Sequence, residues 1–296
     1  ECYCPDDPQV CECYIDFKKQ ASASFLQNRF RDFCGVEIET LNDDLQANEL
    51  SASECQAYQF NQHPDGSLGN LGAEFSSNPA NGDLLFERIR AFCKFLESRK
   101  FYVNSACGLH IHIEVSRRLA YLKKVFAFYK KFETLFFQML PPSRQDNCYC
   151  RKFSHIYQDL KMGDVLSMEK SLEFAEKLYA VKGKREVKGC RTCHSHDKRY
   201  GWVNFHSLFY RGTLEIRAHS GTLNPQKIIN WLNIHHACLN LIKKLPLDII
   251  RRLPDSKACF LSFFDKKLQY YIKQRWKKFS GTSTPTSTPA CETDLN

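Results

Sequence analysis

Eight ionisable side chains recur at every second position in three short segments of the sequence. They are Glu37, Glu39, His110, His112, Glu114, Glu215, Arg217 and His219. Carboxylates placed on neighbouring strands repel one another, and their pKa values rise unless cations lie between them. Oxygen-rich ligand sets suit Mg²⁺ or Mn²⁺, and an imidazole among carboxylates suits Mn²⁺. The residue types therefore indicate a divalent metal site.

The same three segments alternate apolar and polar side chains, which is typical of β-strands with one buried face. They cover residues 35–40, 109–115 and 214–219. They predict a largely antiparallel sheet with an aliphatic face under helices and an opposite face that carries the ionisable groups. Polar faces of antiparallel strands normally meet solvent. The abundance of Glu, His and Arg here favours a site over a solvent face.

Three amphipathic helices are predicted to cover the aliphatic face. The first spans residues 83–98, and the second spans residues 116–140 and ends before Pro141 and Pro142. The third begins at Pro225, with Asn224 as its N-cap. Their apolar stripes are Leu85, Ile89, Phe92 and Leu96, then Leu119, Leu122, Phe126 and Tyr129, then Ile228, Leu232, His235 and Leu239. The fold class is therefore α+β.

The 296 residues contain 43% hydrophobic and 25% charged residues, as globular proteins do. No run of about 18 apolar residues is present, so neither a membrane span nor a membrane partner is expected. The formal charge of +9 fits an anionic partner such as nucleotide phosphate. The basic run at 182–188 lacks interleaved aromatic residues and is typical of a solvated face, so a nucleic-acid partner is not expected for this protein. Fifteen cysteines, an odd number, together with metal-like spacings, favour a reducing, cytoplasmic location.

Composition also divides the chain into three parts. Residues 1–30 form a cysteine-rich extension, residues 31–280 form one α+β catalytic domain, and residues 281–296 form a Ser/Thr/Pro-rich tail that is expected to be disordered. An insertion at about 148–198 interrupts the domain. Its cysteines Cys148, Cys150, Cys190 and Cys193 either hold a structural Zn²⁺ or remain unligated thiols.

The His-x-His pair at 110–112 has a rival interpretation. Such a strand can open the barrel of a zinc-dependent hydrolase, with further metal ligands on later strands. Alternating strand–helix units are not evident after residue 112, so this interpretation is less favoured.

Longer motifs resemble an amidoligase family related to glutamine synthetase and glutamate–cysteine ligase. The matching motifs are FCGVEIET at 33–40, PDGSLG at 64–69, AEFSSNP at 73–79, NSACGLHIHIEV at 104–115, PPSRQDNCYC at 141–150 and RYGWVNFHSLFYRGTLEIRAHSGTLNPQKIINWLN at 199–233. The resemblance implies an antiparallel sheet that forms a funnel, with helices packed on its aliphatic face. It also implies ATP at one end and divalent cations between the nucleotide and the reacting carboxylate.

The resemblance also implies roles for individual residues. The implied ligands of Mg²⁺ or Mn²⁺ are Glu37, Glu39, Asp65, Glu74, His110 and Glu215. His112 and Arg144 are expected near the nucleotide, and Arg217 near the transferred phosphoryl group, so Glu37, Glu215 and Arg217 become the expected catalytic residues. For Arg144 and Asn204, structural hydrogen bonds or ion pairs explain the sequence equally well, and His206 and His219 are interpreted as structural.

The activity implied is an ATP-dependent ligation of a carboxylate, with a glutamyl compound among the candidates, to an amine through an acyl phosphate. The product is an amide or isopeptide bond, and the substrates are small molecules, peptides or proteins. Two alternatives stay open. One is phosphotransfer to a guanidino or other nitrogen acceptor on a related fold, and the other is a zinc-stabilised interaction module without catalysis.

Overall fold

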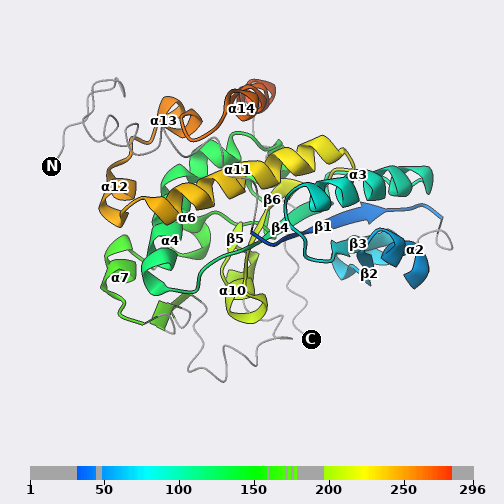
Figure 1. The fold of residues 1–296 in the computed structure, drawn as a ribbon, viewed down its shortest axis with the longest axis horizontal. Coiled ribbons are helices and arrows are strands. Elements are labelled where there is room, and N and C mark those ends of the chain that lie inside the picture. Colours follow the sequence, from blue (N-terminus) through cyan, green and yellow to red (C-terminus); the bar gives the residue numbers. More distant parts are fainter. Residues whose placement is uncertain are drawn as a thin grey trace.

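The computed structural model describes residues 32–44, 49–158, 160–170, 173–174, 177–178 and 197–281. The cysteine-rich extension at 1–30, residues 179–196 of the insertion, and the tail beyond residue 281 lie outside these ranges, so the predictions for them stay predictions. The described residues form one sheet with helices packed against it (Figure 1).

The sheet has six strands in the order β2-β3-β1-β4-β6-β5, and every pairing is antiparallel. The strands are β1 (Cys34–Leu41), β2 (Phe60–Pro64), β3 (Gly72–Ser77), β4 (Gly108–Glu114), β5 (Val203–Asn204) and β6 (Thr213–Ser220). The three predicted strands are β1, β4 and β6, and they lie side by side at the centre of the sheet. The prediction of an antiparallel α+β sheet is confirmed. The sheet is open, and its closure into a funnel stays a prediction.

Three long helices pack on the aliphatic face of the sheet: α3 (Gly82–Ser98), α4 (Leu119–Phe137) and α11 (Pro225–Lys244). α11 contacts α3, α4 and β4 (Figure 1). The aliphatic side chains beneath them, such as Ile38, Ile111 and Ile216, are fully buried. Burial of this apolar area is the main favourable contribution to folding.

These helices confirm the sequence prediction, with small differences at their ends. The second helix is shorter than the expected 116–140, because it begins at Leu119 and ends at Phe137. The predicted N-cap of α11 is present, since the side chain of Asn224 accepts a hydrogen bond from the backbone N–H of Lys227 at 3.1 Å. Pro225 occupies the first turn, where its missing N–H costs nothing.

Shorter elements complete the fold. They are α2 (Ala52–Ala57), η1 (Gly66–Leu71), α5 (Pro142–Gln145), α6 (Phe153–Ile156), α7 (Met162–Ser167), η2 (Asp197–Tyr200), α10 (His206–Arg211), α12 (Leu247–Arg252), α13 (Lys257–Leu261) and α14 (Lys266–Phe279). Among the described helices, none combines the length and the apolar character needed to cross a membrane.

A β-bulge corrects one sequence expectation. His219 was predicted to share a face with Glu215 and Arg217, because the three alternate along the strand. The register between β4 and β6 shifts between Leu109 and Ile111, so that His219 lies opposite Leu109. Its ring contacts Trp231 of α11 at a centroid distance of 5.1 Å. The extra residue shifts the two-residue period, and His219 therefore faces the helices and not the carboxylates.

Candidate active site

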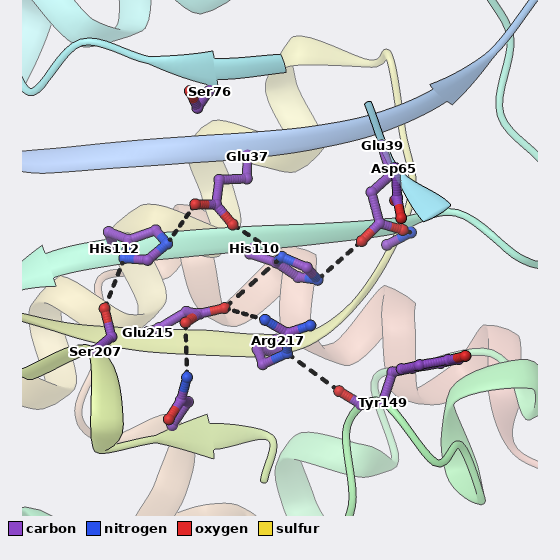
Figure 2. Close-up of polar contacts among 12 residues, drawn as sticks. Glu37, Glu39, Asp65, Ser76, His110, His112, Tyr149, Ser207, Glu215 and Arg217 are labelled. Atoms are coloured by element: carbon purple, nitrogen blue, oxygen red, sulfur yellow. Dashed lines mark hydrogen bonds and ion pairs between the residues drawn. The ribbon is translucent and has the colours of Figure 1, made fainter. Parts of the chain in front are cut away.

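Cross-strand pairing brings the ionisable side chains of the polar face together. Glu37 of β1 lies opposite His110 of β4, and Glu39 lies opposite Glu74 of β3. On the other side of β4, His112 lies opposite Glu215 of β6. Directly opposed residues on antiparallel strands have Cβ atoms roughly 5 Å apart, so their side chains touch. Figure 2 shows the resulting cluster across the centre of the sheet.

His110 is the centre of this cluster. Its Nδ1 lies 3.1 Å from Glu37 Oε2 and 3.8 Å from Glu215 Oε1, while its Nε2 lies 3.2 Å from Glu39 Oε1. The imidazole is buried with an exposed fraction of 3%. One imidazole thus touches carboxylates from two neighbouring strands, as an imidazole ligand of a shared metal site would.

His112 has a different environment. Its Nε2 lies 3.1 Å from Glu37 Oε1, so Glu37 contacts both histidines. Its Nδ1 lies 3.0 Å from the Thr213 hydroxyl. The same nitrogen lies 3.3 Å from the Ser207 hydroxyl (Figure 2). Two hydroxyl groups and one carboxylate therefore fix the ring of His112.

Arg217 is held against the cluster by two contacts. Its guanidinium forms an ion pair with Glu215, and its Nε donates a hydrogen bond to the Tyr149 carbonyl at 3.2 Å. Glu215 also accepts a hydrogen bond from Asn204 Nδ2 at 2.8 Å. Burial alone would raise the pKa of Glu215, but Arg217 and His112 lower it to about 2. Arg217 and Glu215 are therefore both charged at neutral pH.

Glu37 is also held as a carboxylate. Its burial favours the neutral acid, but the neighbouring His112 and His110 lower its pKa well below the ordinary value. Its two oxygens are each within 3.1 Å of an imidazole nitrogen.

Glu74 shows the opposite behaviour. Burial raises its pKa to about 8, with further contributions from the charges of Glu37, Glu39 and Asp65. Asp65 caps η1, where its carboxylate accepts hydrogen bonds from the backbone N–H and the hydroxyl of Ser67 at 2.9 and 2.7 Å. Burial and the charges of three other carboxylates thus favour the neutral form of Glu74. A cation bound here would offset those charges, as expected of a metal site.

Three groups of residues could each hold a metal ion, because the candidate ligand atoms within each group lie within 4.8 Å of one another. The groups are Glu37, Glu74 and His110; then Glu37, His112 and Glu215; then Glu39, Asp65 and Glu74. All six residues that the sequence predicts as Mg²⁺ or Mn²⁺ ligands belong to these groups. His112 joins them, although the sequence placed it nearer the nucleotide.

The cluster lines a pocket of about 510 Å³. Aromatic and basic residues also line this pocket: Tyr149, Arg199, Tyr200 and Arg217. The guanidinium carbons of Arg199 and Arg217 lie 5.5 and 5.8 Å from the centre of the Tyr200 ring. An anion in the pocket would therefore meet arginines as well as a carboxylate-bound cation.

Arg144 lines the same pocket but is used by the sheet. Its Nη2 and Nε donate hydrogen bonds to the carbonyls of Arg217 and Ala218 at 2.8 and 3.3 Å, and its exposed fraction is 2%. These bonds support the structural interpretation of Arg144, because they hold the backbone of β6. A direct contact of Arg144 with nucleotide stays a prediction.

Two of the four cysteines of the predicted zinc site, Cys148 and Cys150, lie in the described residues. Cys148 is disulfide-bonded, whereas Cys150 is a buried free thiol that lies 3.8 Å from the Arg144 carbonyl. A cysteine in a disulfide offers no thiolate to zinc, so at Cys148 the two arrangements exclude each other. Cys190 and Cys193 lie outside the described residues, as do Cys2, Cys4, Cys11 and Cys13.

Several pocket residues were not predicted from the sequence. Ser207 and Thr213 contact His112, and Tyr149, Arg199 and Tyr200 line the pocket. Thr213 is the first residue of β6, and the other four lie in loops or short elements with no periodic pattern. The motifs at 141–150 and 199–233 contain all five residues, but alternation along a strand does not single them out. Asn204, for which a strand hydrogen bond was one alternative, does bind across β5 and β6 to Glu215.

An α+β protein whose antiparallel sheet carries helices on one face and a carboxylate–imidazole–arginine pocket on the other defines a class of candidate metal-dependent enzymes. Comparison with known protein families narrows this class to one family. Residues 17–239 match the family described as "putative amidoligase enzyme", so the chain belongs to the amidoligase family. No curated protein and no solved structure matches the chain.

Proposed function

We propose that this chain is an ATP-dependent ligase that joins a carboxylate to an amine, with Mg²⁺ or Mn²⁺ bound by the carboxylate–imidazole cluster. One observation carries the proposal: Glu37, Glu39, Asp65, Glu74, His110 and Glu215 converge with Arg217 in a single pocket of an amidoligase-family chain.

The residues of the pocket fit divalent cations. Carboxylate oxygens dominate all three groups of potential ligands, and hard cations such as Mg²⁺ prefer oxygen. His110 and His112 extend the set in a way that Mn²⁺ accepts. The raised pKa of Glu74 supports the same conclusion, because a cation at this position would offset the crowding of Glu37, Glu39 and Asp65. When bound, the cations would neutralise phosphate charge and orient the nucleotide.

Arg217 supplies the positive charge of the protein itself. Since Glu215 and the Tyr149 carbonyl hold two sides of its guanidinium, its orientation is fixed before any ligand arrives. A fixed positive group that faces the pocket stabilises negative charge as it develops during phosphoryl transfer. Glu215 therefore acts both as a cation ligand and as the residue that positions Arg217.

The proposed chemistry has two steps. The substrate carboxylate attacks the γ-phosphorus of ATP, the bond to ADP breaks, and an acyl phosphate forms. The amine nitrogen then attacks the acyl carbon, the bond to phosphate breaks, and the nitrogen loses a proton. The products are ADP, phosphate and an amide or isopeptide. The acid and the amine are small molecules, peptides or proteins, and a glutamyl compound is among the candidate acids.

The test is the dependence of ADP release on both substrates. The full chain is supplied with ATP, Mg²⁺ and pools of acids and amines, first separately and then together. A ligase releases ADP in proportion to amide only when both pools are present. ADP release with an amine or guanidino compound alone, together with an N-phosphorylated product, would assign the chain to phosphotransfer. Absence of any nucleotide binding would favour the non-catalytic interaction module.

A further inference from the structure

The positive charge of this protein is concentrated in its C-terminal helices. Residues 225–281, which contain α11 to α14, hold twelve Lys and Arg, three Asp and no Glu. Their formal charge of +9 equals the +9 of the whole chain. The remaining residues are therefore electrically balanced, and an asymmetry of this kind indicates a surface for an anionic partner.

Most of this charge on α14 points to solvent. Its exposed positions carry five lysines, one tyrosine and one glutamine: Lys266, Lys267, Tyr270, Lys273, Gln274, Lys277 and Lys278. We call these seven residues the α14 basic face. α14 itself contains no acidic residue, and no ion pair joins these five lysines to another residue within the described ranges. Ordinary surface helices intersperse both signs of charge.

The two ends of α14 differ in how well they accommodate this charge. Lys266 and Lys267 are the first two residues of α14, at the positive end of the helix macrodipole, where cations are unfavourable, and Asp265 is the N-cap beside them. Lys277 and Lys278 lie in the last turn, where cations are favourable. Partial burial, Arg275 and Lys278 also lower the pKa of Lys227 in α11, against which α14 packs. An anion that covers the face would relieve the repulsion at the first turn.

The chemistry of the face narrows the class of partner. The apolar side chains of α14, Leu268, Ile272 and Trp276, are buried in the protein core, so they are not available for insertion into a membrane. Tyr270, in contrast, is 67% exposed and lies among the lysines. With a rise of about 1.5 Å per residue, Lys266 and Lys273 lie about 6 and 4.5 Å from it along the helix axis.

An aromatic ring between lysines is suited to a chain of phosphates that also presents flat bases. We propose that the α14 basic face binds single-stranded nucleic acid, with the lysines on phosphates and Tyr270 stacked on a base. The face is separate from the pocket, because α14 packs on α11 and lies away from β1 and β3 (Figure 1). This binding is therefore independent of the proposed ligase activity. It departs from the sequence analysis, which did not expect a nucleic-acid partner.

The test measures binding of the full chain to fluorescent single-stranded RNA and DNA of about 12 nucleotides across a range of salt concentrations. One variant replaces Lys266, Lys273 and Lys277 with Gln. A matched control replaces the exposed lysines Lys94, Lys100 and Lys170 with Gln, which makes the same change in net charge. Tyr270→Ala is a third variant. Circular dichroism verifies that each variant is folded.

We expect the α14 triple variant to weaken binding at least about tenfold and to reduce the slope of log K against log salt by about 2, since each phosphate contact contributes about 0.7. Tyr270→Ala should weaken binding about tenfold through lost stacking, while the control stays within about twofold of the wild type. Comparison of the two probes shows whether RNA or DNA is bound more tightly.

Several results would overturn the proposal. They are no binding at low salt, equal losses in the control and α14 variants, or no effect of Tyr270→Ala. Competition by polyglutamate as strong as that by an oligonucleotide would assign the face to an acidic protein instead. Binding to anionic vesicles that the α14 variant abolishes, without oligonucleotide binding, would assign it to a lipid surface. ATP turnover by the α14 variants reports on the proposed ligase separately.

Discussion

Glu74 is a pocket carboxyl group whose neutral form the protein favours. Its pKa of about 8 results first from burial and then from the charges of Glu37, Glu39 and Asp65. Below pH 8 this side chain is largely protonated in the protein alone, and a cation must displace the proton to gain a carboxylate ligand. Metal affinity at this position should therefore increase as the pH rises toward 8.

Gly108→Ala tests how closely the side chains of the proposed metal site are packed. A Cβ atom at this position would lie 3.2 Å from both Glu39 Oε2 and His110 Nε2. Gly108→Ala should displace these two side chains and weaken Mn²⁺ binding by about 10-fold or more, as loss of ligand positioning does. The measurement is a calorimetric titration with Mn²⁺. The control is Gly163→Ala, where a Cβ meets nothing within 4 Å, and equal affinity of both variants would contradict this account.

At the residue scale, the sequence predicted which ionisable side chains converge in the polar cluster, but it did not single out Tyr149, Arg199 or Tyr200. Glu37, Glu39, His110 and Glu215 alternate along strands, and alternation alone places them on one face. Arg199 and Tyr200 belong to a short η2 turn with no period, so only the tertiary structure brings them to the pocket.

At the scale of elements, the bulge in β6 separates residues of the polar cluster from residues that face the helices. It leaves Glu215 in the polar cluster and turns His219 toward α11. The period of two could not reveal this, because a bulge depends on the pairing of β6 with β4 and not on the sequence of either strand. Strands β2, β3 and β5 were also not predicted as strands. β2 and β5 have only 5 and 2 residues, and β3 contains a single large apolar side chain, Phe75, so its alternation is weak.

The burial of His219 makes the fold sensitive to acid. Burial lowers the pKa of His219 to about 3, below its ordinary value of 6.5. Between these values the unfolded chain binds a proton that the folded chain does not, so stability falls as the pH falls from about 6.5 toward 3. His219→Leu should reduce the slope of unfolding free energy against pH by about 1.4 kcal/mol per pH unit. Urea unfolding from pH 4.5 to 6 measures this, and an unchanged slope would show that His219 titrates normally.

The N-cap of α11 offers a second test at this scale. Asn224 caps a helix that contacts α3, α4 and β4, so loss of its hydrogen bond to Lys227 should destabilise the whole domain. Asn224→Ala is expected to lower the free energy of unfolding by about 1 kcal/mol. Urea denaturation gives the value. Asn224→Asp keeps a side-chain oxygen at the cap, so it is the matched substitution and should cost less.

At the scale of the whole molecule, the fold separates three tasks. The helices α3, α4 and α11 bury the aliphatic face, the opposite face of the sheet carries the pocket, and the C-terminal helices carry the net positive charge. The amidoligase family links the second of these to ligation. The sequence did not predict which acid and which amine are used, because the basic and aromatic residues that line the pocket come from separate parts of the chain.

The most direct test of the central claim is Mg²⁺-dependent ATP turnover by Glu37→Gln and Glu215→Gln beside the wild type. Each substitution keeps the shape of the side chain and removes a charge that contacts His110 or Arg217. We predict a loss of turnover of about 100-fold or more in both variants. Glu114→Gln, at the exposed end of β4, is the control and should turn over ATP as the wild type does. Full activity in Glu37→Gln and Glu215→Gln would contradict the assignment of this pocket as the active site.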